Sequence, residues 1–251
     1  MMRVLLLAGT TEGAVLARAL AEDARFDATL SLAGATRNPR PLPLPTRIGG
    51  FGGAAGLADH LRMARVAALL DATHPFAQQI TRNAAEAAAL AGVPLLRINR
   101  PEWPVQPGDR VVASMAEAAA ALGKAPRRVF LTIGRKDLLP FRDGAPQHHY
   151  LVRAVDPPPA EWLPPRATVL AATGPFAPEA ERALLAAHRI EALVSKNSGG
   201  TATAAKLAAA REIGAAVILL ARPAPPPGLH TVPDAATALR WLHARLAERG
   251  V

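Results

Sequence analysis

Several short motifs combine glycine with hydroxyl-bearing or charged residues, a combination typical of loops that bind phosphate groups. The first, Gly9-Thr10-Thr11-Glu12-Gly13, follows the apolar run Val4–Ala8. Its glycines allow the backbone to approach a ligand closely, and the N-terminus of a following helix favours negative charge. The motif departs from GxGxxG, and a strand–helix turn capped by threonine is the alternative. Glu12 would repel a phosphate, so we expect it to cap the helix or to bind a ribose hydroxyl.

Two further motifs indicate which nucleotide such a loop would bind. Thr36-Arg37 follows the apolar run Ala28–Ala33, where folds that bind NAD place an acidic residue and folds that bind NADP place an arginine. A solvated loop arginine is the alternative. The motif Gly49-Gly50-Phe51-Gly52-Gly53 has a permissive backbone that suits close approach to a ligand, although a flexible connection would look the same.

A histidine follows another apolar strand, in the segment Asp71-Ala72-Thr73-His74-Pro75-Phe76-Ala77. A residue before proline is biased toward extended geometry, so we expect the His74 ring at the strand end, where a substrate or a nicotinamide could lie. A structural hydrogen bond is the alternative role for this ring.

The second half of the chain repeats the arrangement with different polar groups. Thr132–Lys136, Ala172–Phe176 and Ser195–Gly200 each follow an apolar run. Lys196 with the serine and glycines after it predicts an anion-binding nest at a helix start. Arg135, Lys136 and Lys196 would then present positive charge to an anion, or be ordinary surface charges.

Composition excludes several other chemistries. The chain has 251 residues and no cysteine, which removes thiol nucleophiles and disulfides. A GxxxxGK[ST] loop and a nucleophile-elbow serine are absent, and the adjacent His148 and His149 would point to opposite faces of a strand, so no metal is expected. The net charge of +9 permits an anionic ligand, while only 4% aromatic residues argue against a nucleic-acid surface.

Periodicity predicts alternating strands and helices, hence an α/β protein with two Rossmann-like doubly wound parallel-sheet domains and a cleft between them. The proline-rich segment 100–109 predicts a linker, which divides the chain into residues 1–104 and 105–251. The final helix, Asp234–Glu248, falls in the second domain. No apolar run approaches the roughly 20 residues that span a bilayer, and the first run is too short for a signal peptide, so we expect a cytoplasmic protein.

The motifs LLLAGTTEG, GGFGG, DATHPFA, RINRPEW, LTIGRKDL, AATGPF and VSKNSGG occur in this order over nearly the whole chain. In that order they resemble the precorrin-6A reductase family of cobalamin biosynthesis, which includes the cobalt-precorrin enzymes. The resemblance implies NADPH-dependent reduction of one double bond of precorrin-6A to give precorrin-6B. The partner would be a tetrapyrrole substrate, with possible hand-over to neighbouring enzymes of the pathway and no nucleic acid or membrane.

Individual roles follow from the resemblance together with the motifs. The residues expected to contact NADPH, with residues 1–104 as its binding domain, are Gly9, Thr10, Thr11, Glu12, Gly13, Thr36, Arg37, Gly50, Phe51, Gly52, Gly53, Thr73, Pro75, Gly174, Ser198 and Gly199. The residues expected to bind the substrate are Phe76, Arg135, Lys136 and Lys196. His74 and Lys196 are the candidate catalytic residues, as proton donors.

Two other classes of protein would share part of this pattern. A short-chain-type dehydrogenase should carry Tyr-x-x-x-Lys, but the single tyrosine, Tyr150, has Ala154 at the fourth position. A nucleotide-sensing module, or an NADP-dependent oxidoreductase with a different anionic substrate, is the alternative that stays open.

Overall fold

The computed structural model describes residues 1–34, 36–37, 39–248 and 250. The chain forms two compact units, one made of Met1–Pro101 together with Pro223–Val251 and the other of Glu102–Arg222. Both are α/β units with a six-stranded sheet in which every pair of neighbouring strands is parallel.

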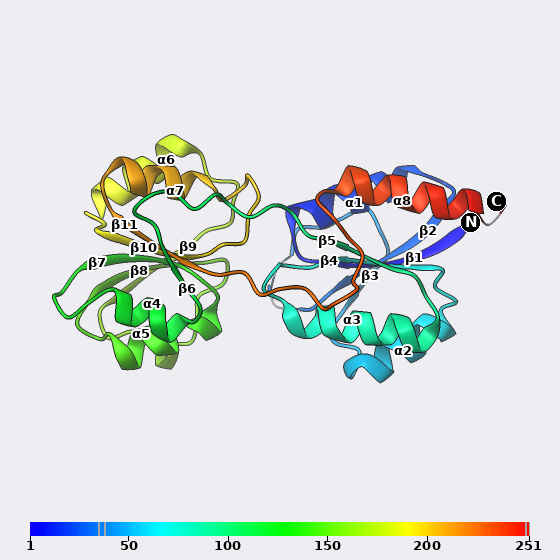
Figure 1. The fold of residues 1–251 in the computed structure, drawn as a ribbon, viewed down its shortest axis with the longest axis horizontal. Helices are drawn as coiled ribbons and strands as arrows, with labels where there is room; N and C mark the ends of the chain where they lie inside the picture. Colours follow the sequence, from blue (N-terminus) through cyan, green and yellow to red (C-terminus); the bar gives the residue numbers. More distant parts are fainter. Residues whose placement is uncertain (35, 38, 249, 251) are drawn as a thin grey trace. The chain divides into compact units, whose positions relative to one another are not determined.

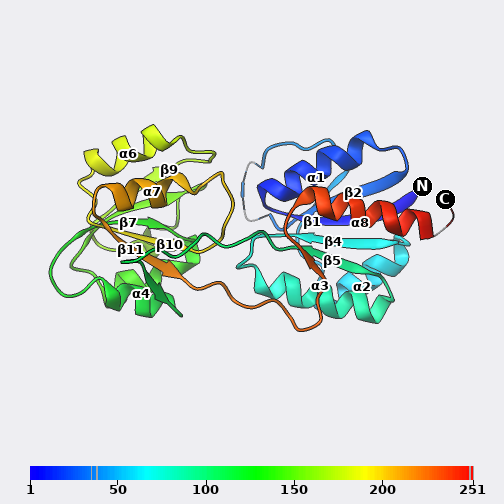
Figure 2. The ribbon, with the colours of Figure 1, turned by 45° about the horizontal axis from the view of Figure 1, so that its top comes forward.

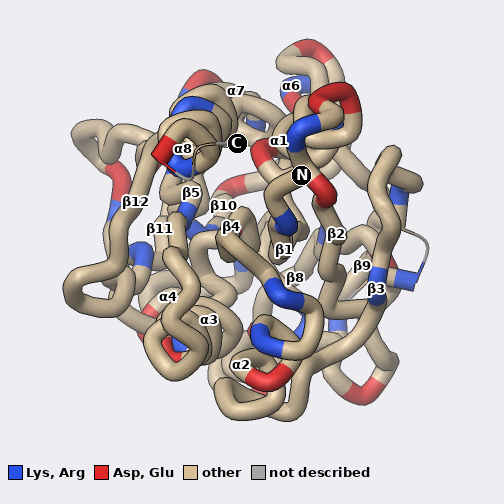
Figure 3. Tube along the Cα trace, turned by 90° about the vertical axis from the view of Figure 1, so that its right-hand side faces the viewer, with Lys and Arg blue, Asp and Glu red and all other residues tan. Residues whose placement is uncertain are grey.

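The sheet of the first unit has the order β12-β5-β4-β1-β2-β3. Its strands are β1 (Met2–Ala8), β2 (Phe26–Leu32), β3 (Thr46–Ile48), β4 (Ala68–Ala72), β5 (Leu95–Ile98) and β12 (Thr231–Val232), and its helices are α1 (Thr11–Glu22), α2 (Gly53–Met63), α3 (Gln78–Ala91) and α8 (Ala235–Glu248). Helices α1 and α8 cover one face and α2 and α3 the other (Figures 1 and 3).

The apolar run of β1 shows why both faces need a helix layer. Val4 and Leu6 belong to the core beneath α1 and α8, whereas Leu5 and Leu7 belong to the core beneath α2 and α3. Successive side chains of a strand point to opposite faces. A continuous apolar run therefore predicts a central strand that is buried on both sides.

The second unit repeats this architecture with the order β6-β11-β10-β7-β8-β9. Its strands are β6 (Arg110–Val112), β7 (Arg128–Thr132), β8 (His149–Ala154), β9 (Ala167–Ala171), β10 (Ala192–Lys196) and β11 (Ala216–Leu220), and its helices are α4 (Met115–Ala121), α5 (Leu139–Gly144), α6 (Pro178–Ala187) and α7 (Ala205–Glu212), with 3-10 turns at Arg135–Asp137 and Ala160–Trp162. Helices α6 and α7 lie on one face of the sheet and α4 on the other (Figure 2). One of its hydrophobic cores contains the buried side chains of Phe130, Leu193 and Leu219.

The predicted α/β class with two parallel sheets is confirmed, but the predicted division at 104/105 is wrong in one respect. The first crossing between units falls at Pro101/Glu102, close to the expected linker, yet the last segment returns to the first unit instead of ending the second. Strand β12 pairs with β5, and α8 buries Leu242 and Leu246 in the first core. An amphipathic helix shows which of its faces is buried, but not which of two similar sheets it covers.

No helix in the described part of the chain has the length and apolar character needed to cross a membrane. Most expected elements agree with the structure to within a few residues at their ends. The two-residue strand β12 and the short helix α5 were missed, because neither is long enough to show a period.

The return of α8 makes a test of the division possible. Leu242 is fully buried against the first sheet, so Leu242→Ala should lower the free energy of unfolding of that unit by about 2–5 kcal/mol. Amide hydrogen exchange should accelerate in β1 and β5, while β7 and β10 keep their protection.

Leu207→Ala, at a 2% exposed site of α7 in the second core, is the matched control and should give the opposite pattern. Faster exchange in β7 and β10 of the Leu242 variant would show that α8 belongs with the second unit.

Candidate functional site

Four of the predicted motifs lie at the carboxyl edge of the first sheet. The segments Gly9–Gly13, Thr36–Arg37, Gly50–Gly53 and Thr73–Phe76 follow β1, β2, β3 and β4 respectively, and these four strands are neighbours in the order β4-β1-β2-β3. Because the strands are parallel, their carboxyl ends meet at one edge, the place where open α/β sheets bind ligands.

Thr10 joins the first of these turns to the fourth. Its hydroxyl donates to the Ala72 carbonyl oxygen at 2.8 Å and accepts from the Gly13 amide at 3.2 Å, so it caps α1 and fastens the helix to the end of β4. A Cβ on Gly13 would lie 3.0 Å from the Ala8 Cβ and 3.2 Å from the Ala72 Cβ. Glycine at this position therefore lets the start of α1 pack directly on two strand ends.

Glu12 has a partner that the sequence analysis did not foresee. The Arg100 guanidinium bonds its carboxylate at 2.7 Å, and both side chains are largely buried. The negative charge beside the first turn of α1 is thus balanced within this unit. Glu12 does not cap the helix, because Thr10 does.

Arg47, another residue that the sequence analysis missed, organises the glycine-rich loop. Its guanidinium donates to the carbonyl oxygens of Gly49 at 3.0 Å and Gly50 at 2.9 Å and lies 3.7 Å from the centre of the Phe51 ring. Gly52 has a φ of 80°, which a side chain would disfavour. The loop is held in one shape by these contacts, unlike a flexible connection.

Helix α2 packs tightly against the same loop. A Cβ on Gly56 would lie 1.8 Å from the Phe51 carbonyl oxygen, so no other residue fits there. The His60 ring is 5.2 Å from the Phe51 ring, and burial together with the nearby Arg47 charge lowers the pKa of His60. His60 is therefore neutral at pH 7 and adds no charge to the loop.

The His74 turn rests on a buried ion pair. Asp71, which is fully buried at the end of β4, pairs with Arg97 of β5, and its carboxylate also accepts from the Thr73 amide at 3.0 Å and the Thr73 hydroxyl at 2.7 Å. Thr81 of α3 donates to the same carboxylate at 2.8 Å. One carboxylate therefore joins two strands, the turn and a helix.

Within the turn, the His74 ring accepts a hydrogen bond at Nδ1 from the Phe76 amide at 3.3 Å. The proton of the neutral ring consequently resides on Nε2. The two rings lie 5.8 Å apart, and both side chains are half-buried. The neutral ring thus presents an N–H at Nε2, and a second proton on the ring would have to go to Nδ1.

Lys196 and the loop after β7 meet at the carboxyl edge of the second sheet. The Lys196 ammonium lies 2.5 Å from the Asp137 carboxylate, which also accepts from the Gly134 amide at 3.1 Å. Arg135 and Lys136 come from the same 3-10 turn as Asp137. The three basic residues therefore lie at or just after the ends of two neighbouring strands, β7 and β10, and Asp137, which the sequence analysis missed, offsets the charge of Lys196.

The loop after β10 is held by the segment that enters the second unit. The Asn197 side chain accepts from the Trp103 amide at 2.9 Å and donates to its carbonyl oxygen at 3.1 Å, and the indole donates to the Gly200 carbonyl oxygen at 2.8 Å. Ser198 and Gly199 are buried. Helix α7 begins only at Ala205, so this loop is not its first turn, as the expected nest at a helix start would require.

The loop after β9 is organised by a second buried ion pair. Arg153 pairs with Glu181 through two bonds of 2.5 Å and 2.9 Å, and its guanidinium lies 3.7 Å from the centre of the Phe176 ring. The Phe176 amide donates to the Ala202 carbonyl oxygen at 3.2 Å, and Gly174 lies close beneath the ring. The contacts of Phe176 with Arg153 and with Gly174 therefore fix the conformation of this loop.

The structure therefore groups the predicted site residues by unit. The first unit contains His74 and the four motifs of its sheet edge. The second unit contains Gly174, the nearby Phe176, and Lys196. The missed residues carry charge within apolar strands or beside the loops: Arg47, Asp71, Arg97, Arg100 and Asp137. Asp71 and Arg97 had a signal in the sequence, because opposite charges in two neighbouring buried strands must pair.

Among the residues that the structure describes, no three histidine, aspartate or glutamate side chains come together as metal ligands would. The only tyrosine of the sequence, Tyr150, is buried, and its hydroxyl donates to the Ala145 carbonyl oxygen at 2.7 Å. Burial raises the pKa of this phenol. Tyr150 therefore has a structural role.

Two parallel sheets with glycine-, threonine- and arginine-bearing loops at their carboxyl edges define a Rossmann-like α/β protein of the ligand-binding class. The family model described as "Precorrin-6x reductase CbiJ/CobK" matches residues 3–243. The chain belongs to this family. It is thereby placed among the reductases of cobalamin biosynthesis, and a reductase of this kind implies a nicotinamide cofactor.

Individual relatives agree with this assignment. The chain is 54% identical over 227 residues to precorrin-6A reductase of Sinorhizobium sp, covering 89% of this chain and 86% of that one. It is 50% identical over 245 residues to precorrin-6A reductase of Rhodococcus erythropolis, covering 96% and 98%. A solved structure titled CobK precorrin-6A reductase superimposes with a TM-score of 0.91 at 47% identity, covering 98% of this chain and 97% of that one.

The two hydrogen bonds of Thr10 can be tested directly. Thr10→Val keeps the shape and suits the extended backbone of this residue, but leaves the Gly13 amide and the Ala72 carbonyl oxygen without their partner. We expect the free energy of unfolding to fall by about 1–3 kcal/mol. Thr10→Ser retains both bonds and should stay close to the unchanged protein in urea titrations. Equal stability of the two variants would contradict the linking role of Thr10.

Proposed function

We propose that this chain catalyses the NADPH-dependent reduction of one macrocycle double bond of precorrin-6A, giving precorrin-6B in cobalamin biosynthesis. The observation that carries the proposal is the convergence of four ligand-type loops at one sheet edge in a chain of the precorrin-6x reductase family. The alignments with the two relatives named as precorrin-6A reductases extend over 89% and 96% of this chain and over 86% and 98% of those proteins.

The first unit has the features that a nicotinamide nucleotide needs. The exposed Gly9 and Thr11 flank the capping Thr10, and the close packing allowed by Gly13 brings the N-terminus of α1 to the strand ends. Backbone amides there would hold the pyrophosphate. The charge of Glu12 does not oppose this arrangement, because Arg100 balances it.

The neighbouring loops would hold the two ends of the cofactor. Thr36 and the exposed Arg37 follow β2, where a guanidinium recognises a ribose 2′-phosphate. Gly50–Gly53 and Thr73–Phe76 would lie beside the nicotinamide. In the second unit, Gly174, Ser198 and Gly199 are proposed as further cofactor contacts.

The substrate bears several acetate and propionate carboxylates, and basic residues bind such groups with charge-assisted hydrogen bonds. Arg135, Lys136 and Lys196 would supply this charge, with Phe76 as an apolar contact for the macrocycle. Asp137 holds the Lys196 ammonium at 2.5 Å, which orients it. Hand-over of the product to the next enzyme of the pathway is also part of the proposal.

Reduction of a double bond needs a hydride, which the nicotinamide supplies when bound, and a proton. We assign the proton to His74 in its imidazolium form, because loss of the Nδ1 proton returns the neutral ring that accepts from the Phe76 amide. The Asp71 network fixes the turn that holds the ring. Lys196 is the second candidate for this role.

Anaerobic incubation with precorrin-6A and either NADPH or NADH tests the reaction. We expect NADPH and precorrin-6A to be consumed in equal molar amounts, as followed by the absorbance of both. Arg37→Gln should weaken NADPH binding by about tenfold or more through loss of the 2′-phosphate contact, and leave NADH binding unchanged. Absence of NADPH consumption would refute the reaction, and a preference of the unchanged protein for NADH would refute the role of Arg37.

His74 is tested by a pair of variants. His74→Ala should lower turnover by about 10²-fold or more while NADPH affinity changes little. His74→Asn can still accept from the Phe76 amide but cannot donate a proton as a histidine does, so it should lose turnover as well. Full activity of the Asn variant, or equal losses of turnover and NADPH affinity in both variants, would show that His74 only organises the turn.

A further inference from the structure

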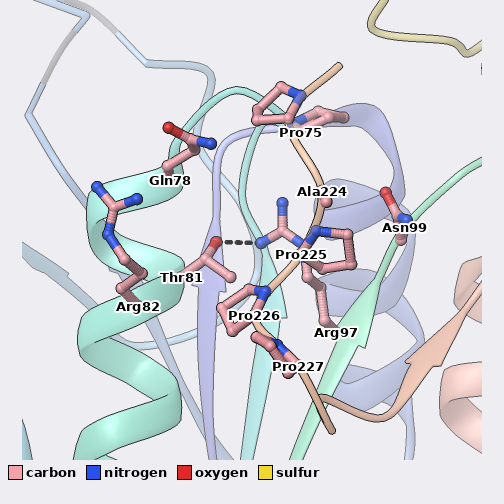
Figure 4. Close-up of a pocket in the computed structure, with 11 residues that line it drawn as sticks. Pro75, Gln78, Thr81, Arg82, Arg97, Asn99, Ala224, Pro225, Pro226 and Pro227 are labelled. Carbon is pink, nitrogen blue, oxygen red and sulfur yellow. Dashed lines mark hydrogen bonds between the residues drawn. The ribbon is translucent and has the colours of Figure 1, made fainter.

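A cavity of about 240 Å³ lies in the first unit, beside the buried Asp71–Arg97 pair and apart from the first three motifs (Figure 4). One wall is the start of α3, with Gln78, Thr81 and Arg82, and the other is the segment Pro223–Pro227, where the chain re-enters this unit. Pro75 and Asn99, which follow β4 and β5, complete the lining.

Arg97 places an incompletely used guanidinium in this cavity. Its side chain is 4% exposed, and Nη1 donates to Asp71 and Thr81. Within the described part of the chain, Nε and Nη2 make no hydrogen bond. Figure 4 shows a second guanidinium nitrogen directed away from Thr81, toward Pro75. Neither atom is among the described side-chain atoms that are buried without a partner, so both reach the cavity solvent, where an acceptor of a ligand can replace water.

The remaining lining selects for an anion. Arg82 adds a positive charge, and the described lining residues include no acidic side chain. Asp71 already balances Arg97, so Arg82 leaves the cavity with a positive balance. The four prolines of this wall have no backbone N–H, and Ala224 is its one residue that has one, so donor side chains are concentrated on the side of α3 and β5.

The volume of the cavity indicates whether it can hold a whole ligand or only part of one. Pockets for entire small ligands measure about 300–1,000 Å³, and a water molecule takes about 30 Å³. The cavity of about 240 Å³ therefore suits a carboxylate with its methylene stem and is too small for a tetrapyrrole ring. An oxidised nicotinamide is cationic, and Arg82 and Arg97 would repel it.

Resting on the proposed function, we propose that this cavity binds one carboxylate side arm of the macrocycle, with Nε and Nη2 of Arg97 as its bidentate donors. The arm would fix the position of the reacting ring relative to the His74 turn, because Pro75 borders both. Arg97 cannot be replaced as a test, since its loss would leave Asp71 buried without a counter-charge.

Two variants alter the cavity by different physical means. Gln78→Glu adds a negative charge at the first residue of α3, where an acidic group stabilises the helix, so the fold should not suffer. Ala224→Leu fills space with no change of charge. Each should raise the KM for precorrin-6A by about tenfold, which corresponds to about 1.4 kcal/mol, with kcat and the KM for NADPH nearly unchanged.

Asn83→Asp is the matched control, because it adds the same charge to α3 at a side chain whose oxygen already accepts from Gln79 at 2.8 Å and which does not line the cavity. Its KM for precorrin-6A should stay unchanged. A rise in the KM for NADPH instead, or a rise in Gln78→Glu that Asn83→Asp matches and Ala224→Leu lacks, would overturn the proposal. Unchanged KM values in both cavity variants would do so too.

Titration with propionate, followed by the NMR signal of the Arg97 Nε–H, separates this inference from the proposed function. We expect saturable shifts in the unchanged protein and none in Ala224→Leu. Saturation without turnover of precorrin-6A would refute the proposed reaction and leave a carboxylate site. Turnover without propionate shifts or KM effects would refute the cavity proposal alone.

Discussion

The buried pair of Asp71 and Arg97 is the constraint on which the arrangement of the first unit depends. Two charges at the ends of adjacent central strands are costly to bury, and removing one partner of such a pair typically costs about 3–5 kcal/mol. The cost is offset because the Asp71 carboxylate also accepts from Thr73 and Thr81. The pair therefore ties the His74 turn and α3 to the sheet, and it holds a guanidinium at the cavity wall.

The second constraint is the close packing of the start of α1 against the ends of β1 and β4, which depends on steric contact and not on charge. Gly13 admits no side chain without displacing Ala8 or Ala72, and Thr10 bonds across to the end of β4. The N-terminal turn of α1 and the His74 turn are thereby held on neighbouring strands. Because α1 starts so close to β1 and β4, its backbone amides reach the sheet edge, where a phosphate would lie.

Periodicity was sufficient to predict the two parallel sheets, since continuous apolar runs such as Val4–Ala8 indicate strands buried on both faces. It was not sufficient to place α8, because the apolar stripe with Leu242 would fit either sheet. The motif glycines and threonines were predictable from their types. Arg47 and Asp137 were not, because their partners are a loop carbonyl group and a lysine distant in sequence, and loop conformation is not encoded in a period.

The misplaced C-terminal segment also explains why the cavity escaped the sequence analysis. Its proline wall, Pro223–Pro227, comes from the return of the chain to the first unit, so the wall exists only if α8 and β12 pack there. Its four prolines fix φ and offer no N–H, which makes this wall stiff and leaves Ala224 as its one residue with a backbone N–H. A carboxylate arm bound as proposed would direct its oxygen atoms toward Arg97 and its apolar stem toward the prolines. The return of the chain that brings α8 to the first core thus also supplies one wall of the cavity.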